Sequence, residues 1–138
     1  MKNISIITML LVLLGIGTTQ AQTIRPEKTN YLVLSKNIQQ LKPVMLTAAE
    51  LAKQDGNDYG EFYVIFCGKT VQELSKDNDF LSLAKQAKEQ NLKVFVCGLS
   101  LQKFGIDPKD IPKTIEVTEN GILDGFQLTK KGFITLTI

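Results

Sequence analysis

The sequence predicts an α/β domain: a three-layer α/β/α arrangement in which helices cover both faces of a five-stranded parallel sheet. Short apolar runs alternate with longer amphipathic stretches, and each separation holds the roughly dozen residues that a crossover between parallel strands requires. With 43% hydrophobic and 22% charged residues, the composition is typical of a globular chain. A chain of 138 residues without a low-complexity stretch or a linker is expected to form one domain.

The first two predicted strands enclose the first predicted helix. Residues 30–35, NYLVLS, are short, apolar and bounded by polar residues, which is typical of a buried strand. Pro43 is tolerated in a first helical turn, and the apolar residues of 44–54 recur at helical spacing until Gly56. Residues 61–67, EFYVIFC, are apolar at consecutive positions, so we expect an interior strand with both faces covered.

A second helix and a third strand follow. Residues 71–74 are expected to form a brief helical turn, and residues 80–91, FLSLAKQAKEQN, form an amphipathic pattern with Asp79 placed as its N-cap. Residues 93–97, KVFVC, predict the third strand. The LSLQKFGI segment after it predicts a short helix that ends near Gly105.

The C-terminal part supplies the last two strands. Asp107 and the proline after it signal another helix start, and residues 114–118, TIEVT, predict a weaker fourth strand. Residues 120–131 predict a helix that Gly132 ends, and residues 133–138, FITLTI, the fifth strand. The apolar residues expected on the buried side of this helix are Ile122, Leu123, Phe126 and Leu128.

Residues 1–21 have the pattern of a secretory signal peptide. Lys2 precedes an apolar run over residues 4–14, and small and polar residues then lead to a cleavage site after Ala21. The run is shorter than the roughly 20 residues needed to cross a bilayer, although a retained membrane anchor is the alternative. We therefore expect residues 22–138 to form a single periplasmic or secreted domain with no membrane segment after cleavage.

Several classes of function have no support in the composition. The chain has 16 basic and 14 acidic residues with no basic stripe, so nucleic acid is not an expected partner. It has no histidine, the commonest general base and metal ligand, and two cysteines alone do not make a four-ligand zinc site. The GKT at residues 68–70 lacks the glycine of a phosphate loop, because Tyr63 stands at that position. We expect neither a metal nor a cofactor.

Two cysteines each end a predicted strand and precede a glycine. The carboxyl ends of parallel strands form the ligand crevice of such sheets, so Cys67 and Cys97 are both expected there. The helix start after Cys97 would favour its thiolate, and Gly98 would let a substrate approach the backbone. We expect the Cys97 thiol to lie at the mouth of the crevice, easily ionised and accessible.

Other roles for the cysteines stay open at this point. A buried cysteine packs well at the end of a strand and can be purely structural. If the two strands are neighbours, their backbones lie about 4.8 Å apart, within the roughly 4.4–6.8 Å between Cα atoms that a disulfide requires. An oxidising compartment would permit that bond.

Three segments carry a resemblance to a known family. VFVCGLSLQKFGI at residues 94–106, DIPKTIEVTENG at residues 110–121 and LDGFQLTKKGFITL at residues 123–136 resemble the DsrE-like sulfur-relay family. The likeness covers essentially the whole mature chain. It implies the strand order 4-3-2-1-5, assembly into homo-oligomers, and a persulfide on the cysteine after the third strand, Cys97. Cys67 matches no family position, and an export signal departs from the commonly cytoplasmic members.

The function implied by this resemblance is that of a sulfur carrier, or a sulfurtransferase-like protein, that works with a sulfur donor or acceptor protein. Persulfide transfer is attack of a thiolate on sulfur, so it needs no histidine. Ser100 could hold the sulfur anion and Lys103 could favour it electrostatically, while Gly98 and Cys67 complete the candidate binding residues. The alternative is a non-enzymatic α/β module that binds a small ligand or a protein and has a structural or disulfide-bonded cysteine pair.

Overall fold

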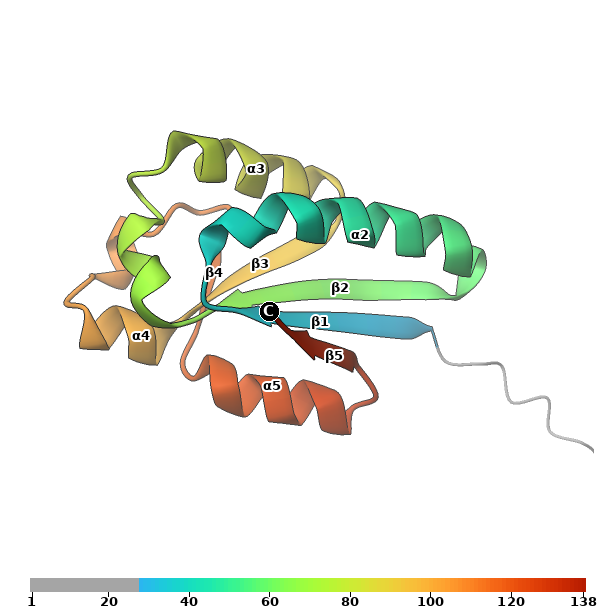
Figure 1. Cartoon of the computed structure of the whole chain (residues 1–138). Helices are drawn as coiled ribbons and strands as arrows, with labels where there is room; N and C mark the ends of the chain where they lie inside the picture. Colours follow the sequence, from blue (N-terminus) through green and yellow to red (C-terminus); the bar gives the residue numbers. More distant parts are fainter. Residues whose placement is uncertain (1–27) are drawn as a thin grey trace, which may run out of the picture.

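The computed structural model describes residues 28–138 as a parallel sheet flanked by helices (Figure 1). The signal peptide predicted for residues 1–21 lies outside this range. Within residues 28–138, no helix is both long and apolar enough to span a membrane. The elements are β1 (Thr29–Ser35), η1 (Ile38–Gln40), α2 (Leu41–Asp55), η2 (Gly56–Asp58), β2 (Tyr59–Phe66), η3 (Gly68–Glu73), α3 (Asn78–Glu89), β3 (Leu92–Cys97), α4 (Gly98–Lys103), η4 (Pro108–Asp110), β4 (Glu116–Thr118), α5 (Gly121–Lys130) and β5 (Ile134–Thr137).

All five strands run parallel in the order β4-β3-β2-β1-β5, so the predicted fold class and strand order are confirmed. β2 lies at the centre of the sheet, between β1 and β3. Its register with β3 pairs Phe66 with Val96, and this pairing places the residues that follow each of them, Cys67 and Cys97, beside one another.

Helices α2 and α3 cover one face of the sheet, and α5 covers the other (Figure 1). The larger core lies under α2 and α3, where Phe62, Val64 and Phe66 of β2 contribute their side chains. Ile65 points to the opposite face and packs with Leu32 and Phe133 in a smaller core. The consecutive apolar residues of β2 therefore have the expected cause: both faces of the strand are covered.

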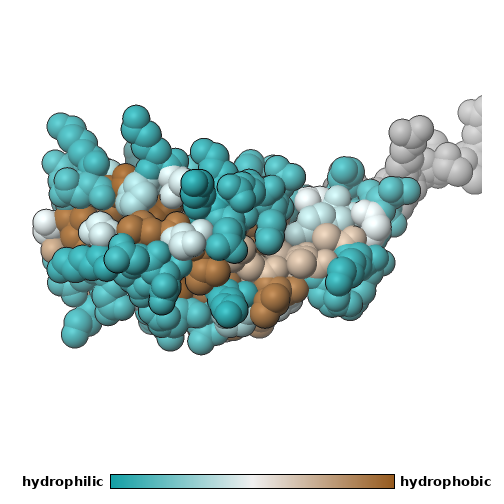
Figure 2. All heavy atoms as spheres, turned by 90° about the horizontal axis from the view of Figure 1, so that it is seen from above, coloured by the Kyte–Doolittle hydropathy of each residue, from teal (hydrophilic) through white to brown (hydrophobic). Residues whose placement is uncertain are grey.

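The outer side of α2 and α3 is mainly hydrophilic. Figure 2 looks onto the molecule from above and shows hydrophobic side chains between hydrophilic ones on this face. A shallow groove between the two helices includes Met45, Leu46 and Leu83. Leu46 is 65% exposed, while Met45 one position earlier is buried, as the helical period requires.

The α5 helix packs in the opposite sense to the sequence prediction. Three residues expected on its buried side are exposed: Ile122 by 61%, Leu123 by 50% and Phe126 by 67%. Its buried residues are Gly121 and Gly125. The physical reason is a close approach to the sheet, because a Cβ on Gly125 would lie 3.0 Å from a methyl group of Leu34. Only Leu128 of the expected set packs against the smaller core.

The start of α3 also differs from the prediction. The N-cap is Asp77, whose Oδ1 accepts a hydrogen bond of 2.9 Å from the backbone N–H of Phe80. Asp79, expected in that role, lies inside the first turn, where a carboxylate still suits the helix dipole. The fourth strand is shorter than expected and begins at Glu116.

Candidate functional site

The two cysteines lie side by side at the carboxyl edge of the sheet. Cys67 directly follows Phe66 at the end of β2, and Cys97 is the last residue of β3. Since Phe66 pairs with Val96, the next residue of each strand falls at the same register position, and side chains at matched positions point to the same face. That face is the one that α5 covers, because Gly121 at the start of α5 adjoins both cysteine side chains.

The first N–H of α5 binds the Cys97 sulfur. Gly121 donates its backbone N–H to Cys97 Sγ at 3.3 Å. The Asn120 side chain caps the same helix by accepting hydrogen bonds from the N–H groups of Ile122 and Leu123. The Gly121 N–H is therefore directed at the Cys97 sulfur, while the next two N–H groups of the helix bind the Asn120 side chain. The predicted helix start after Cys97 also contributes, through the backbone N–H of Ser100 in α4, but the part that α5 plays was not predicted.

The pKa of Cys97 is lowered below its ordinary value. Burial is the largest influence and opposes ionisation, but the hydrogen bonds to the sulfur together outweigh it. The donors are the backbone N–H of Gly121, the hydroxyl and backbone N–H of Ser100, and the Cys67 side chain. The predicted ease of ionisation therefore has a structural basis, in which neighbouring N–H groups stabilise the thiolate.

The Cys67 thiol behaves in the opposite way. Burial raises the pKa of Cys67 to about 12, and the charge of Cys97 and the hydrogen bond to it act in the same direction. Lys36, which follows β1 at the same edge, partly opposes this rise in the Cys67 pKa. Cys97 is therefore the more readily ionised thiol of the pair, and both cysteines are free.

The accessibility expected for Cys97 is wrong. Cys97 is only 3% exposed, whereas Cys67 is half-buried. The segment between β4 and α5 covers the site, since the N–H of Leu99 donates to the carbonyl of Glu119 at 3.1 Å and Gly121 lies against the sulfur atoms. Cys67 is therefore the more accessible thiol of the pair.

The other predicted site residues have different outcomes. Ser100 is buried beside Cys97, and its Oγ also accepts a hydrogen bond of 2.8 Å from the N–H of Gly68, which joins the two strand ends. A Cβ on Gly98 would lie 2.9 Å from the carbonyl oxygen of Thr118, so this glycine permits a close approach of backbone, not of substrate.

Lys103 does not take part in the site. It is exposed at the far end of α4, and its Nζ lies 5.8 Å from the centre of the Phe104 ring. The cation near the thiols is Lys36. The strand order indicates that Lys36 lies near Cys67, because these residues follow the neighbouring strands β1 and β2.

Gly121 lies against both cysteine side chains. A Cβ at this position would lie 3.0 Å from Cys67 Sγ, 3.2 Å from Cys97 Cβ and 2.7 Å from Ile65 Cγ2. Such contacts are shorter than the about 3.5–4.0 Å at which carbon atoms pack, so only glycine fits. The same absence of a side chain brings the helix N–H within reach of the sulfur.

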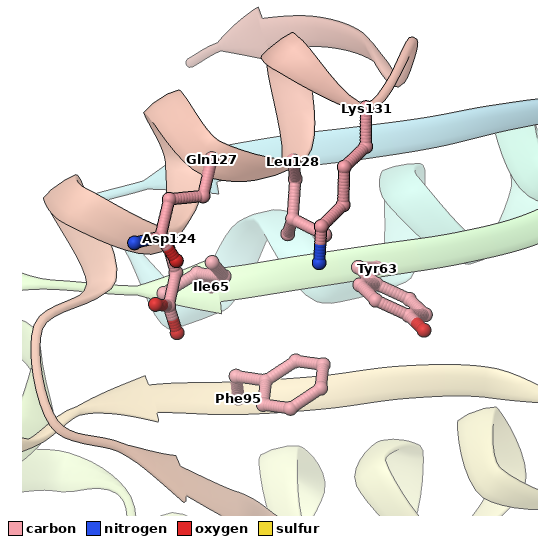
Figure 3. A pocket seen from close by; sticks show the side chains of 7 residues that line it. All are labelled: Tyr63, Ile65, Phe95, Asp124, Gln127, Leu128 and Lys131. Atoms are coloured by element: carbon pink, nitrogen blue, oxygen red, sulfur yellow. The ribbon is translucent and has the colours of Figure 1, made fainter.

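A cavity of about 240 Å³ lies between α5 and the sheet on the same face as the cysteines. Its floor is formed by Tyr63, Ile65 and Phe95, and side chains of α5 point down toward it (Figure 3). Ile65 connects the cavity to the thiols, since it lines the cavity and also adjoins Gly121. The lining residues from α5 and the turn after it are Asp124, Gln127, Leu128 and Lys131.

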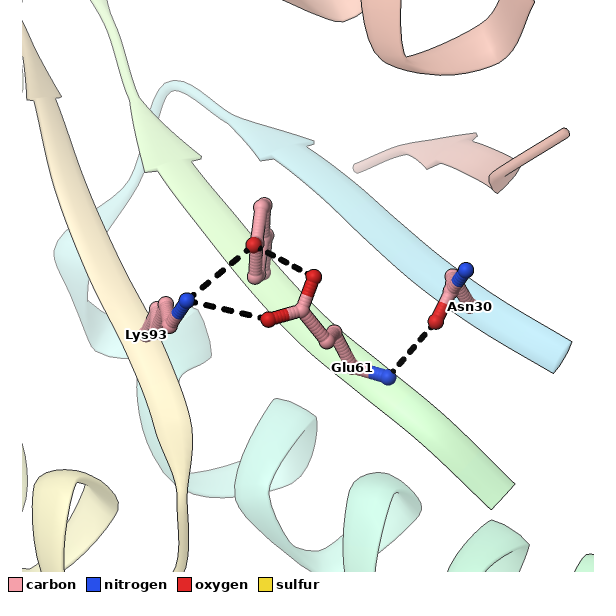
Figure 4. Close-up of polar contacts among 4 residues, drawn as sticks. Asn30, Glu61 and Lys93 are labelled. Atoms are coloured by element: carbon pink, nitrogen blue, oxygen red, sulfur yellow. Dashed lines mark hydrogen bonds and ion pairs between the residues drawn. The ribbon is translucent and has the colours of Figure 1, made fainter. Parts of the chain in front are cut away.

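A polar cluster lies farther along the same face of the sheet (Figure 4). Lys93 Nζ lies 3.0 Å from Glu61 Oε1 and 3.2 Å from the Tyr63 hydroxyl, which donates to Glu61 Oε2 at 2.7 Å. Hydrogen bonds from Tyr63 and Lys93 lower the pKa of Glu61. Because the ion pair is about half exposed, it adds little stability, and it mainly orients Tyr63 at the cavity.

The structure thus defines a class of protein: a parallel α/β domain with a paired thiol site at the carboxyl edge of its sheet. Across the described residues, no three Cys, Asp or Glu side chains gather in a group that could hold a metal ion. Residues 31–137 match the DsrE/DsrF-like family, and the chain belongs to this family, which is associated with sulfur relay in general.

A solved structure supports the fold. A protein of unknown function from Methanobacterium thermoautotrophicum superimposes with a TM-score of 0.66 at 12% sequence identity, over 81% of this chain and 99% of that one. At this identity the likeness concerns the fold alone. No curated protein matches the sequence.

Proposed function

We propose that this protein carries sulfur as a persulfide on Cys97. The observation that carries the proposal is the hydrogen bond from the Gly121 N–H to a cysteine sulfur whose pKa is lowered. A thiolate is the form of cysteine that attacks sulfur. Membership of a family associated with sulfur relay supports the same assignment.

The proposed reaction is a displacement at sulfur. The Cys97 thiolate attacks the outer sulfur of a donor persulfide, a new bond forms between Cys97 Sγ and that sulfur, and the donor leaves as a thiolate. An acceptor thiolate then attacks the carried sulfur in the same manner and releases the Cys97 thiolate. No net oxidant or reductant is consumed. Since Cys97 is buried, the donor's sulfur enters beside the half-buried Cys67.

A sulfur-uptake measurement tests this function. After incubation of reduced protein with glutathione persulfide and removal of the donor, the Cys67→Ala variant should gain the mass of one sulfur atom at Cys97. Cys97→Ala, the matched control, should gain none. Equal uptake by the two variants, or uptake by neither, would exclude Cys97 as the carrier.

The second candidate is a binding module without sulfur chemistry. The observations that favour it are the cavity beside α5, with aromatic residues and both charge signs in its lining, and the burial of Cys97. In this function the cysteines would be structural, or joined in a disulfide in an oxidising compartment. The uptake measurement separates the two candidates, because a purely structural Cys97 takes up no sulfur.

We propose further that the chain is exported to the periplasm or secreted and that it self-associates. The signal pattern of residues 1–21 supports export. The outward face of α5, formed by Ile122, Leu123 and Phe126, supports self-association, since all three apolar side chains are exposed. Such clusters on a protein surface commonly mark interfaces.

A further inference from the structure

The site contains a second thiol that the carrier reaction does not use. Cys67 lies at the register position beside Cys97, where parallel strands are about 4.8 Å apart. A disulfide requires Cα atoms roughly 4.4–6.8 Å apart, and the ordinary spacing of neighbouring strands falls within this range.

The side chains also meet on one side of the sheet. Cys67 Sγ and Cys97 Cβ both lie within 3.2 Å of the single point that a Cβ of Gly121 would occupy. The two thiols also hydrogen-bond to one another, an interaction that lowers the pKa of Cys97 and raises that of Cys67. A sulfur bound to Cys97 is therefore formed within reach of a neighbouring thiol.

We infer that Cys67 is the resolving thiol of this site and discharges the Cys97 persulfide as hydrosulfide. This inference rests on the persulfide proposed above. The anionic outer sulfur of the Cys97 persulfide first takes the proton of the neighbouring Cys67 thiol, which becomes a thiolate. Cys67 Sγ then attacks Cys97 Sγ, the bond between Cys97 Sγ and the outer sulfur breaks, and a Cys67–Cys97 disulfide forms while the protonated outer sulfur leaves as HS⁻. One persulfide anion and one thiol thus give one disulfide and one hydrosulfide anion, with no external oxidant.

A competing attack does not change the final products. If Cys67 attacks the outer sulfur instead, the sulfur moves to Cys67 and the Cys97 thiolate is restored. That exchange is reversible and keeps the sulfur on the protein. Attack by Cys97 on the Cys67 persulfide then gives the same disulfide and the same hydrosulfide. Because hydrosulfide diffuses away, release drains both persulfides.

The resulting disulfide stops further uptake, since no thiolate remains to attack a donor. A dithiol reductant restores the site by becoming a disulfide itself, while both cysteines return to thiols. The protein would then release one hydrosulfide for each dithiol oxidised whenever no acceptor takes the sulfur first.

The test follows sulfur and thiols together. Fully reduced full-length protein is loaded with glutathione persulfide without oxygen, separated from the donor, and sampled over time for intact mass, free thiols and released hydrosulfide. We expect wild type to lose the added sulfur, to release one hydrosulfide per disulfide formed, and to have no alkylatable thiol afterwards. The Cys67→Ala variant should keep the added sulfur and release none. Protein treated identically without donor should keep both thiols, which excludes oxidation by air.

The outcomes distinguish this inference from the carrier function. If wild type keeps its sulfur for as long as Cys67→Ala does, with Cys67 free, the resolving role is refuted and the carrier stands. Uptake by neither protein refutes both. Hydrosulfide release without a matching disulfide also refutes the resolving role. The ratio of hydrosulfide to disulfide in wild type decides the question even if the Cys67→Ala variant does not fold, and Cys67→Ser provides a second non-nucleophilic variant.

Discussion

The Gly121→Ala variant tests the geometry on which the site depends. A new methyl group would lie 2.7 Å from Ile65 Cγ2 and 3.0 Å from Cys67 Sγ. Carbon atoms pack at about 3.5–4.0 Å, so α5 or its neighbours must move by roughly 1 Å. Overpacking of this kind costs about 1–3 kcal/mol, and the better helix propensity of alanine returns less than about 1 kcal/mol at a first helical position.

We therefore expect the free energy of unfolding to fall by about 1–2 kcal/mol, which for a domain of this size lowers the melting temperature by roughly 5–10 °C. Displacement of α5 also lengthens the hydrogen bond from the residue 121 N–H to Cys97 Sγ, now 3.3 Å, so the pKa of Cys97 should rise. Urea unfolding measures the stability, and the ultraviolet absorbance of the thiolate, followed against pH, measures the ionisation without depending on access to the thiol.

Gly125→Ala is the matched control, because it makes the same substitution one turn later on α5. Its new Cβ would meet only the side chain of Leu34, at 3.0 Å, and the flexible end of a leucine can move. It should leave the thiolate titration unchanged. If Gly121→Ala is as stable as wild type and titrates identically, the close packing of α5 on the thiols is not real and the reasoning fails.

Three further predictions follow from single contacts. Ser100→Ala removes the acceptor of the Gly68 N–H and a donor to Cys97. The free energy of unfolding, measured with urea, should fall by about 1–2 kcal/mol, and the Cys97 pKa, measured by thiolate absorbance, should rise. Ser82→Ala at an exposed position should change neither quantity. Tyr31→Phe removes a 2.6 Å hydrogen bond to Asp55, which raises the pKa of Tyr31 to about 12. This bond stabilises the fold fully below the unfolded pKa of about 10 and is lost as the pH rises toward 12. The variant should therefore be about 1 kcal/mol less stable than wild type at neutral pH and equally stable at the alkaline end, and a pH-independent difference in stability would contradict this. Phe126→Glu should shift sedimentation toward the monomer, while Gln102→Glu at an exposed position of α4 should not. Unchanged sedimentation of both variants would exclude the outward face of α5 as the interface.

The sequence was sufficient to predict the order of elements and the place of both cysteines in them. Apolar runs such as EFYVIFC indicate a strand that is buried on both faces, and they can be read from neighbouring residues alone. The adjacency of Cys67 and Cys97 followed once the strand order was expected, because neighbouring parallel strands place their following residues together.

The cover over Cys97 could not be predicted in this way. It depends on Glu119 and Gly121, more than twenty residues later in the chain, and nothing local to Cys97 indicates that they pack there. The orientation of α5 was mispredicted for a related reason. Hydrophobic periodicity assumes that the apolar side faces the core, but this helix approaches the sheet so closely that Gly121 and Gly125 face it instead, and Phe126 is left outside.

The α5 helix thus has two tasks on opposite sides: Gly121 closes over the thiols, and Ile122, Leu123 and Phe126 face outward. A partner copy held by the outward side would fix the position of the helix above the sulfur atoms. An added sulfur or a disulfide that displaces Gly121 would then change the affinity between copies. Because such coupling is reciprocal, assembly would change the equilibrium between the thiol and modified states of the cysteines by the same factor. The quaternary state of this protein should then report the chemical state of its cysteines.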